Sequence, residues 1–135
     1  MNLDLNGKHI LITGGSKGIG LACAKLFVQE GARVSLLARD EAALSAARET
    51  LNGLREHSVG STMSVDLRQP GPTADAVSAI EAANGPIDVL VNSAGAAQRT
   101  PYNELTADKW HAAMDAKYFT YIHLIDPVIK RMAAR

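Results

Sequence analysis

The first feature that could do chemistry is a glycine-rich turn, Thr13-Gly14-Gly15-Ser16-Lys17-Gly18-Ile19-Gly20, which follows a short apolar run. Glycine accepts positive φ angles and lets a ligand approach the backbone closely. Where such a turn opens a helix, the first-turn N–H groups and the helix dipole favour a phosphate. A tight strand-to-helix turn without a ligand is the alternative, but it does not explain the Ser and Lys among the glycines. The pattern therefore predicts a nucleotide site formed by Gly14, Ser16, Lys17, Gly18, Ile19 and Gly20.

The spacing within this turn excludes two common nucleotide-binding loops. No Gly-Lys-Ser or Gly-Lys-Thr closes the turn, so it is not the phosphate loop of nucleoside triphosphatases. Three residues separate Gly14 from Gly18, so it is not the Gly-x-Gly-x-x-Gly of dehydrogenases with a separate substrate domain.

The elements that must position this turn alternate between strand-like and helix-like segments. Strands are expected at residues 8–13, 33–38, 59–65 and 87–92, where short apolar or alternating runs end at turn residues. Helices are expected at 18–30, 41–54 and 73–83, and from a Thr106 cap to about residue 132 with a bend at Pro127. Pro70-Gly71-Pro72 is expected to separate the third strand from its helix.

This alternation predicts an α/β fold, a doubly wound parallel sheet of the Rossmann-like kind with four strands in this chain. Ligands of such sheets lie at the carboxyl ends of the strands. At 135 residues the chain is expected to be one domain. The fourth strand would ordinarily be interior, so we expect an incomplete domain with an apolar edge at 89–91.

Composition argues against several other classes of function. Lys plus Arg equals Asp plus Glu at 14 each, so no overall field favours nucleic acid or an acidic membrane. The single cysteine, Cys23, cannot form an internal disulfide and is expected to be a small buried side chain on its helix. His9, His57, His111 and His123 lack ligand spacing, so they are expected at the surface or in packing, and no metal site is predicted. No signal peptide and no bilayer-spanning run is seen, which favours the cytoplasm.

The pattern Thr-Gly-x-x-x-Gly-x-Gly resembles that of the short-chain dehydrogenase/reductase family. Asn92-Ser93-Ala94-Gly95, at the end of the fourth strand, is similar to the family's Asn-Asn-Ala-Gly motif. Asp66-Leu67, at the end of the third strand, matches the family's Asp-hydrophobic pair, which contacts the adenine ring. The resemblance implies that Asp66, Leu67, Asn92, Ala94 and Gly95 bind a nicotinamide cofactor, and that the substrate is a small carbonyl compound or alcohol.

The end of the second strand indicates which cofactor is preferred. An acidic residue about 20 positions after the glycine loop accepts the ribose 2′-OH of NAD, whereas an Arg nearby accommodates the 2′-phosphate of NADP. Here Ala38 occupies the acidic position and Arg39 follows it. Lys17 corresponds to a second cation in NADP-preferring relatives. We expect NADP rather than NAD, the alternative being that Arg39 is a solvated side chain paired with Asp40 or Glu41.

The last helix departs from the family pattern. Family members carry an Asn seven residues after a Trp, and that Asn helps to hold a water of the proton relay. With Trp110 as the reference, this position is Lys117. A charged lysine donates hydrogen bonds but accepts none. Lys117 is therefore either a catalytic residue of altered role or a helix side chain that reaches solvent.

The family's acid/base residues, a Tyr followed four residues later by Lys, are expected beyond this helix. Tyr118 and Tyr121 are followed at that spacing by Ile122 and Ile125. We therefore expect a cofactor-binding half that is inactive alone. The alternative is a non-catalytic nucleotide-binding module.

The helix from Thr106 carries an apolar stripe of Trp110, Met114, Tyr118 and Tyr121. We expect this stripe to face the sheet or a partner helix. The resemblance implies a homo-oligomer formed through this helix.

Overall fold

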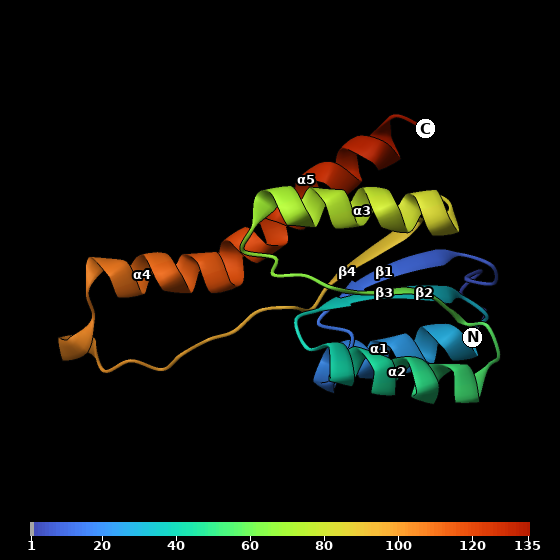
Figure 1. Ribbon diagram of the computed structural model, residues 1–135, viewed down its shortest axis with the longest axis horizontal. Coiled ribbons are helices and arrows are strands. Elements are labelled where there is room, and N and C mark those ends of the chain that lie inside the picture. The colour runs from blue at the N-terminus through green and yellow to red at the C-terminus, as the bar shows by residue number, and fades with distance from the viewer. Residues whose placement is uncertain (1) are drawn as a thin grey trace.

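A computed structural model describes residues 2–135 as a four-stranded parallel sheet with helices on both faces (Figure 1). The strands are β1 (His9–Thr13), β2 (Arg33–Ala38), β3 (Val59–Ser64) and β4 (Val89–Asn92). Their order across the sheet is β3-β2-β1-β4. The predicted doubly wound, Rossmann-like fold is confirmed.

The register of the strands aligns their carboxyl ends. Thr13, the last residue of β1, pairs with Leu37 of β2 on one side and with Asn92 of β4 on the other. The loops that leave these three strands therefore meet at one edge of the sheet. Ligands of open α/β sheets bind at this edge.

The sheet separates the core into two layers, and a pair of helices covers each layer. Helices α1 (Gly18–Gln29) and α2 (Glu41–Leu54) cover one face of the sheet, and α3 (Pro70–Asn84) and α5 (Thr120–Ala133) cover the other (Figure 1). Ile10 and Ile12 belong to the first layer and Leu11 to the second, all three fully buried. A strand buried on both faces reads as a continuous apolar run, which is why β1 was predictable from the sequence.

Helix α3 begins earlier than predicted. Pro70 is the first residue of α3, whereas the helix was expected to begin at residue 73. Proline is tolerated in the first turn because its missing N–H would have no helical partner there. The sequence Pro70-Gly71-Pro72 therefore forms the first turn of α3 and does not separate the strand from the helix.

The last predicted helix is interrupted at a different place from the one expected. It consists of α4 (Ala107–Met114), a π-helical turn η2 (Asp115–Phe119) and α5, and it is preceded by the short 3₁₀ helix η1 (Tyr102–Glu104). Pro127 lies inside α5. A π turn frees a carbonyl group from the regular ladder, and here the carbonyl of Ala116 accepts a hydrogen bond from Ala96 N at 3.2 Å.

The apolar stripe of the last helix does not face the sheet, contrary to one expectation. The side chains of Trp110, Met114 and Tyr118 are 59%, 45% and 52% exposed. Helix α4 extends away from the body of the domain (Figure 1), so the sheet is out of its reach. The contacts to the core come instead from Leu124 and Val128 on α5.

Cys23 on α1 is not fully buried, contrary to expectation. Ile19 and Leu26 are exposed and Cys23 is only half-buried. The buried residues of α1 are the small ones, Gly20 and Ala24, with Val28. Small residues let the helix axis approach the sheet closely, so apolar content alone did not reveal the packed face.

Strand β4 stands at one edge of the sheet, with β1 as its neighbour. Val89, Leu90 and Val91 are half-buried there, as the expected apolar edge requires. Among residues 2–135, none of the helices combines the length and the apolar character needed to cross a membrane.

Candidate functional site

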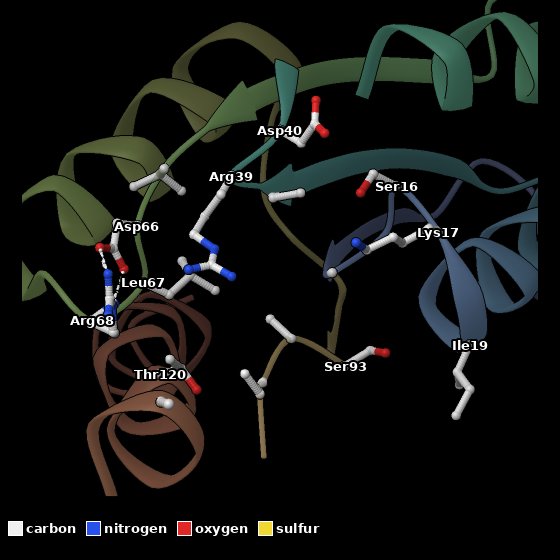
Figure 2. Close-up of a pocket in the computed structure, with 17 residues that line it drawn as sticks. Ser16, Lys17, Ile19, Arg39, Asp40, Asp66, Leu67, Arg68, Ser93 and Thr120 are labelled. Carbon is white, nitrogen blue, oxygen red and sulfur yellow. Dashed lines mark hydrogen bonds and ion pairs between the residues drawn. The ribbon is translucent and has the colours of Figure 1, made fainter. Parts of the chain in front are cut away.

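A pocket of about 770 Å³ lies at the carboxyl ends of the strands (Figure 2). This volume is in the range of small-molecule and cofactor sites. The pocket is lined by segments that follow all four strands and by residues of η2 and the start of α5. The lining residues are Gly14, Ser16, Lys17, Ile19, Ala38, Arg39, Asp40, Val65, Asp66, Leu67, Arg68, Ser93, Ala94, Gly95, Ala96, Ala116 and Thr120.

The glycine turn after β1 requires its glycines for two different reasons. At Gly20, a Cβ would stand 2.2 Å from the carbonyl oxygen of Gly14, so no side chain fits. At Gly18, φ is +56° and a Cβ would meet nothing within 4 Å. Gly20 thus lets the helix begin tightly against the turn, and Gly18 leaves open space beside the helix N-terminus. This cradle fits a phosphate.

Thr13 joins this turn to the loop after β4. Its Oγ1 accepts hydrogen bonds from the backbone N–H groups of Ser93 and Ala94, each at 3.1 Å. Gly14, in turn, packs against Ala94, since a Cβ on Gly14 would lie 3.0 Å from Ala94 Cα. Two of the motifs recognised in the sequence are therefore held in contact.

Two cations reach the pocket from neighbouring loops. Figure 2 shows Arg39 extending from the end of β2 into the pocket. Asp66 lies on one side of Arg39 and Lys17 on the other. Within residues 2–135, neither Arg39 nor Lys17 forms a salt bridge. The Asp40 carboxylate caps α2, where it accepts a hydrogen bond from Ala43 N at 3.0 Å. The pairing of Arg39 with Asp40 considered above is thus not observed.

Asp66, at the far wall of the pocket, is held by Arg68 (Figure 2). The guanidinium donates to both carboxylate oxygens, with Arg68 Nη2 2.8 Å from Asp66 Oδ2 and Nε 3.0 Å from Oδ1. These hydrogen bonds lower the pKa of Asp66 to about 2. Sequence reasoning missed Arg68, although its position two residues after the aspartate was a signal for a local ion pair.

Lys117 lies in η2 and does not line the pocket. Its alkyl chain packs against Gly95, where a Cβ would be 2.8 Å from Lys117 Cδ. Its Nζ stands 5.3 Å from the centre of the Tyr121 ring. The structure therefore brings Lys117 to the loop after β4 and to the rim of the pocket.

The other residues predicted for the site divide into lining and supporting groups. Gly14, Ser16, Lys17, Ile19, Arg39, Asp66, Leu67, Ala94 and Gly95 line the pocket. Gly18, Gly20 and Asn92 are outside the lining, and Asn92 Oδ1 is a buried oxygen with no partner among residues 2–135. Lining residues that the sequence did not point to include Val65, Ala96, Ala116 and Thr120. Across the same residues no cluster of His, Cys, Asp or Glu is placed to hold a metal.

The pocket thus combines a phosphate cradle, the cations Lys17 and Arg39, which form no salt bridge among residues 2–135, and the Asp66–Arg68 pair, arranged across the ends of adjacent strands. It suits an elongated ligand that carries phosphate near the middle and at one side.

Comparisons with known proteins give a consistent result. The sequence model of the short chain dehydrogenase family matches residues 8–135. Gluconate 5-dehydrogenase from Gluconobacter oxydans is 34% identical over 132 residues, which are 98% of this chain and 51% of that protein. The structure of L-sorbose reductase from Gluconobacter frateurii, complexed with NADPH and L-sorbose, superposes with a TM-score of 0.91 at 31% identity, covering 100% of this chain and 51% of the other.

A second solved structure is also similar. The NADPH-bound short chain oxidoreductase from Pseudomonas aeruginosa PAO1, described as containing an atypical catalytic center, has a TM-score of 0.88 at 29% identity. The match covers 95% of this chain and 50% of that protein. The chain spans about half the length of each of these relatives.

Proposed function

The chain belongs to the short-chain dehydrogenase family, and on that premise we propose that it binds NADP(H) for hydride transfer between the nicotinamide and a carbonyl or alcohol group of a small substrate. The observation that carries the proposal is a pair of cations, Arg39 and Lys17, that lie beside a glycine cradle in one pocket and form no salt bridge within residues 2–135. NADPH in two structural relatives supports the same choice.

The position of each residue in the pocket indicates which part of the cofactor it would bind. The turn at Gly14, Ser16 and Gly18 would bind the diphosphate through backbone N–H groups at the start of α1. Arg39 and Lys17 would bind the 2′-phosphate, which NAD lacks. The Arg39 guanidinium forms no salt bridge among residues 2–135, so it is available for charge-assisted hydrogen bonds to that phosphate.

The two ends of the pocket would then hold the two ends of the dinucleotide. Asp66 and Leu67 would contact adenine, because an ionised carboxylate accepts hydrogen bonds from an exocyclic amine. The loop Ser93 to Gly95 would hold the nicotinamide half, on the side away from Arg39. The bound nicotinamide would donate or accept the hydride. The protein would orient it and exclude water.

We further propose that the general acid/base of the reaction is not among residues 1–135. None of the tyrosines Tyr102, Tyr118 and Tyr121 is followed four residues later by Lys. Residues 1–135 would therefore bind the cofactor in a single domain without catalysing hydride transfer. Lys117, packed on Gly95, would take the place of the family's Asn as a donor beside the nicotinamide half.

The exposed apolar residues Trp110, Met114 and Tyr118 support the proposal of a homo-oligomer formed through the helix from Thr106. Large exposed apolar surfaces mark protein contacts. The cytoplasmic location and the lack of nucleic-acid or membrane partners stay predictions from the sequence.

The proposal is tested by calorimetric titration of the purified protein with NADPH and with NADH. We expect NADPH to bind at least about tenfold more tightly, because each charge-assisted hydrogen bond contributes about 1.5 kcal/mol or more. Equal affinities would remove the NADP preference, and no binding of either dinucleotide would overturn the proposed function.

A further inference from the structure

Arg68 uses most of the acceptor capacity of Asp66. Asp66 Oδ1 accepts from the backbone N of Arg68 at 3.0 Å and from its Nε at 3.0 Å. Asp66 Oδ2 accepts from Nε at 3.2 Å and from Nη2 at 2.8 Å. An ionised carboxylate has about four acceptor sites. Three N–H groups of one neighbouring residue occupy most of them, because the Nε–H is shared between the two oxygens.

This arrangement limits what the carboxylate can recognise in the pocket. Both Asp66 and Arg68 line the pocket, with Arg39 nearby. In the proposed function, on which this inference rests, Asp66 would accept a hydrogen bond from the 6-amino group of adenine. While the guanidinium of Arg68 stays in place, it competes for both carboxylate oxygens and leaves that amine at most one acceptor position.

We propose that Arg68 is a specificity-determining residue of the base subsite: it masks Asp66, so that the protein recognises the 6-amino group of adenine only weakly. The base would be held mainly by stacking and by apolar contact with Val65 and Leu67, and Asp66 would serve to position Arg68.

The chemistry of the guanidinium strengthens this effect. A guanidinium has five N–H donors, and Asp66 engages only those on Nε and Nη2. The remaining donors suit an acceptor that both purines carry, such as the ring nitrogen N7. A site that offers donors to the base and hides its acceptor is expected to bind amino and oxo purines with similar affinity.

The arrangement is maintained across ordinary pH. Hydrogen bonding by Arg68 lowers the pKa of Asp66 to about 2, so the carboxylate stays ionised and cannot donate. The Asp115 carboxylate on η2 also acts on Arg68 and contributes to raising its pKa. Arg68 is therefore stabilised in its charged form by two carboxylates, although its side chain is 49% exposed.

The experiment uses calorimetry to compare the affinity for NADPH with that for its hypoxanthine analogue, the reduced form of nicotinamide hypoxanthine dinucleotide phosphate. In the unaltered protein the affinities of the two dinucleotides should lie within about threefold of each other. The 6-amino group that hypoxanthine lacks makes no strong hydrogen bond to Asp66 in this protein. In Arg68→Met the carboxylate is free, and NADPH should be preferred by about tenfold, the effect of one hydrogen bond to a charged group. Arg68→Lys replaces the planar guanidinium with an ammonium group. Its preference for NADPH should lie between those of the unaltered protein and Arg68→Met.

Two further variants complete the design. Arg99→Met, a change of the same kind at an exposed loop residue outside the pocket, should leave the preference as in the unaltered protein. The double variant Asp66→Ala with Arg68→Met should lose the tenfold preference again. A preference that is the same in Arg68→Met and in the unaltered protein would overturn this inference while leaving NADPH binding intact. Failure of the unaltered protein to bind either dinucleotide would overturn the proposed function, and this inference with it.

Discussion

The side chain of Lys117 occupies the space that a side chain on Gly95 would need. A Cβ on Gly95 would stand 2.8 Å from Lys117 Cδ and 3.0 Å from its Nζ. The two residues belong to distant parts of the sequence, the loop after β4 and the π turn η2. Their contact, with the hydrogen bond from Ala96 N to the Ala116 carbonyl, fixes the loop against the last helical segment.

This contact predicts that Gly95 and Lys117 are energetically coupled. Gly95→Ala should destabilise the protein by more than about 1 kcal/mol, because the φ of +155° at Gly95 disfavours a side chain and because the flexible lysine has to move aside. In a Lys117→Ala background the cost should fall by at least about 0.5 kcal/mol. Urea unfolding of the four proteins of this cycle measures the coupling. The same cost in both backgrounds would show that the contact is not made.

The glycine turn gives a second prediction. Gly20→Ala should destabilise the protein by more than about 2 kcal/mol and prevent cofactor binding, because its Cβ would stand 2.2 Å from a backbone oxygen. Backbone atoms, unlike a lysine tip, cannot move aside cheaply. The matched control is Gly53→Ala in α2, where a Cβ meets nothing within 4 Å. Alanine there should stabilise the helix by about 0.5–1 kcal/mol.

Thermal unfolding and NADPH titration of both glycine variants provide the measurement. A Gly20→Ala protein with the unaltered melting temperature and affinity would refute the close approach of α1 to the turn.

The buried His9 gives a prediction about pH. It is 2% exposed, its Nε2 is 2.9 Å from Ser35 Oγ, and its Nδ1 faces the carbonyls of Gly85 and Pro86. Burial lowers the pKa of His9 below its usual 6.5, and the positive charge of Arg33 acts in the same direction. The unfolded chain therefore binds a proton first on acidification, so the free energy of unfolding should fall as the pH drops below about 6.5.

Comparison with His9→Gln isolates this effect from the other histidines. Denaturant unfolding at about pH 7.5 and about pH 5.5 should show a larger loss of stability for the unaltered protein than for the variant. Equal losses would mean that His9 does not stay neutral in the folded state.

The sequence predicted the fold well because its signals were local. Each strand end was marked by a turn residue, and the apolar run of β1 indicated a strand buried on both faces. The motif at Asn92 and the turn at Gly14 were correctly expected at one edge of the sheet, since parallel strands bring their carboxyl ends together.

What could not be predicted depends on contacts between distant segments. The packed face of α1 is formed by Gly20 and Ala24, whose small size carries no periodic apolar signal. The π turn at Asp115–Phe119 depends on a hydrogen bond to Ala96, about twenty residues earlier. Arg68 was missed because a charged residue after a strand is usually a solvated one, and only its geometry shows that it occupies Asp66.

The central claim, that Arg39 makes this pocket a site for the phosphorylated dinucleotide, is tested most directly by Arg39→Asp. Calorimetric titration should show NADPH affinity reduced by more than about tenfold, because a charge-assisted contact to the 2′-phosphate becomes a repulsion. NADH affinity should fall by less than about threefold, since NADH has no 2′-phosphate for the new carboxylate to repel. Lys25→Asp, the same kind of charge reversal at an exposed residue of α1 outside the pocket, should affect neither. Equal losses of NADPH and NADH affinity in Arg39→Asp would contradict the claim.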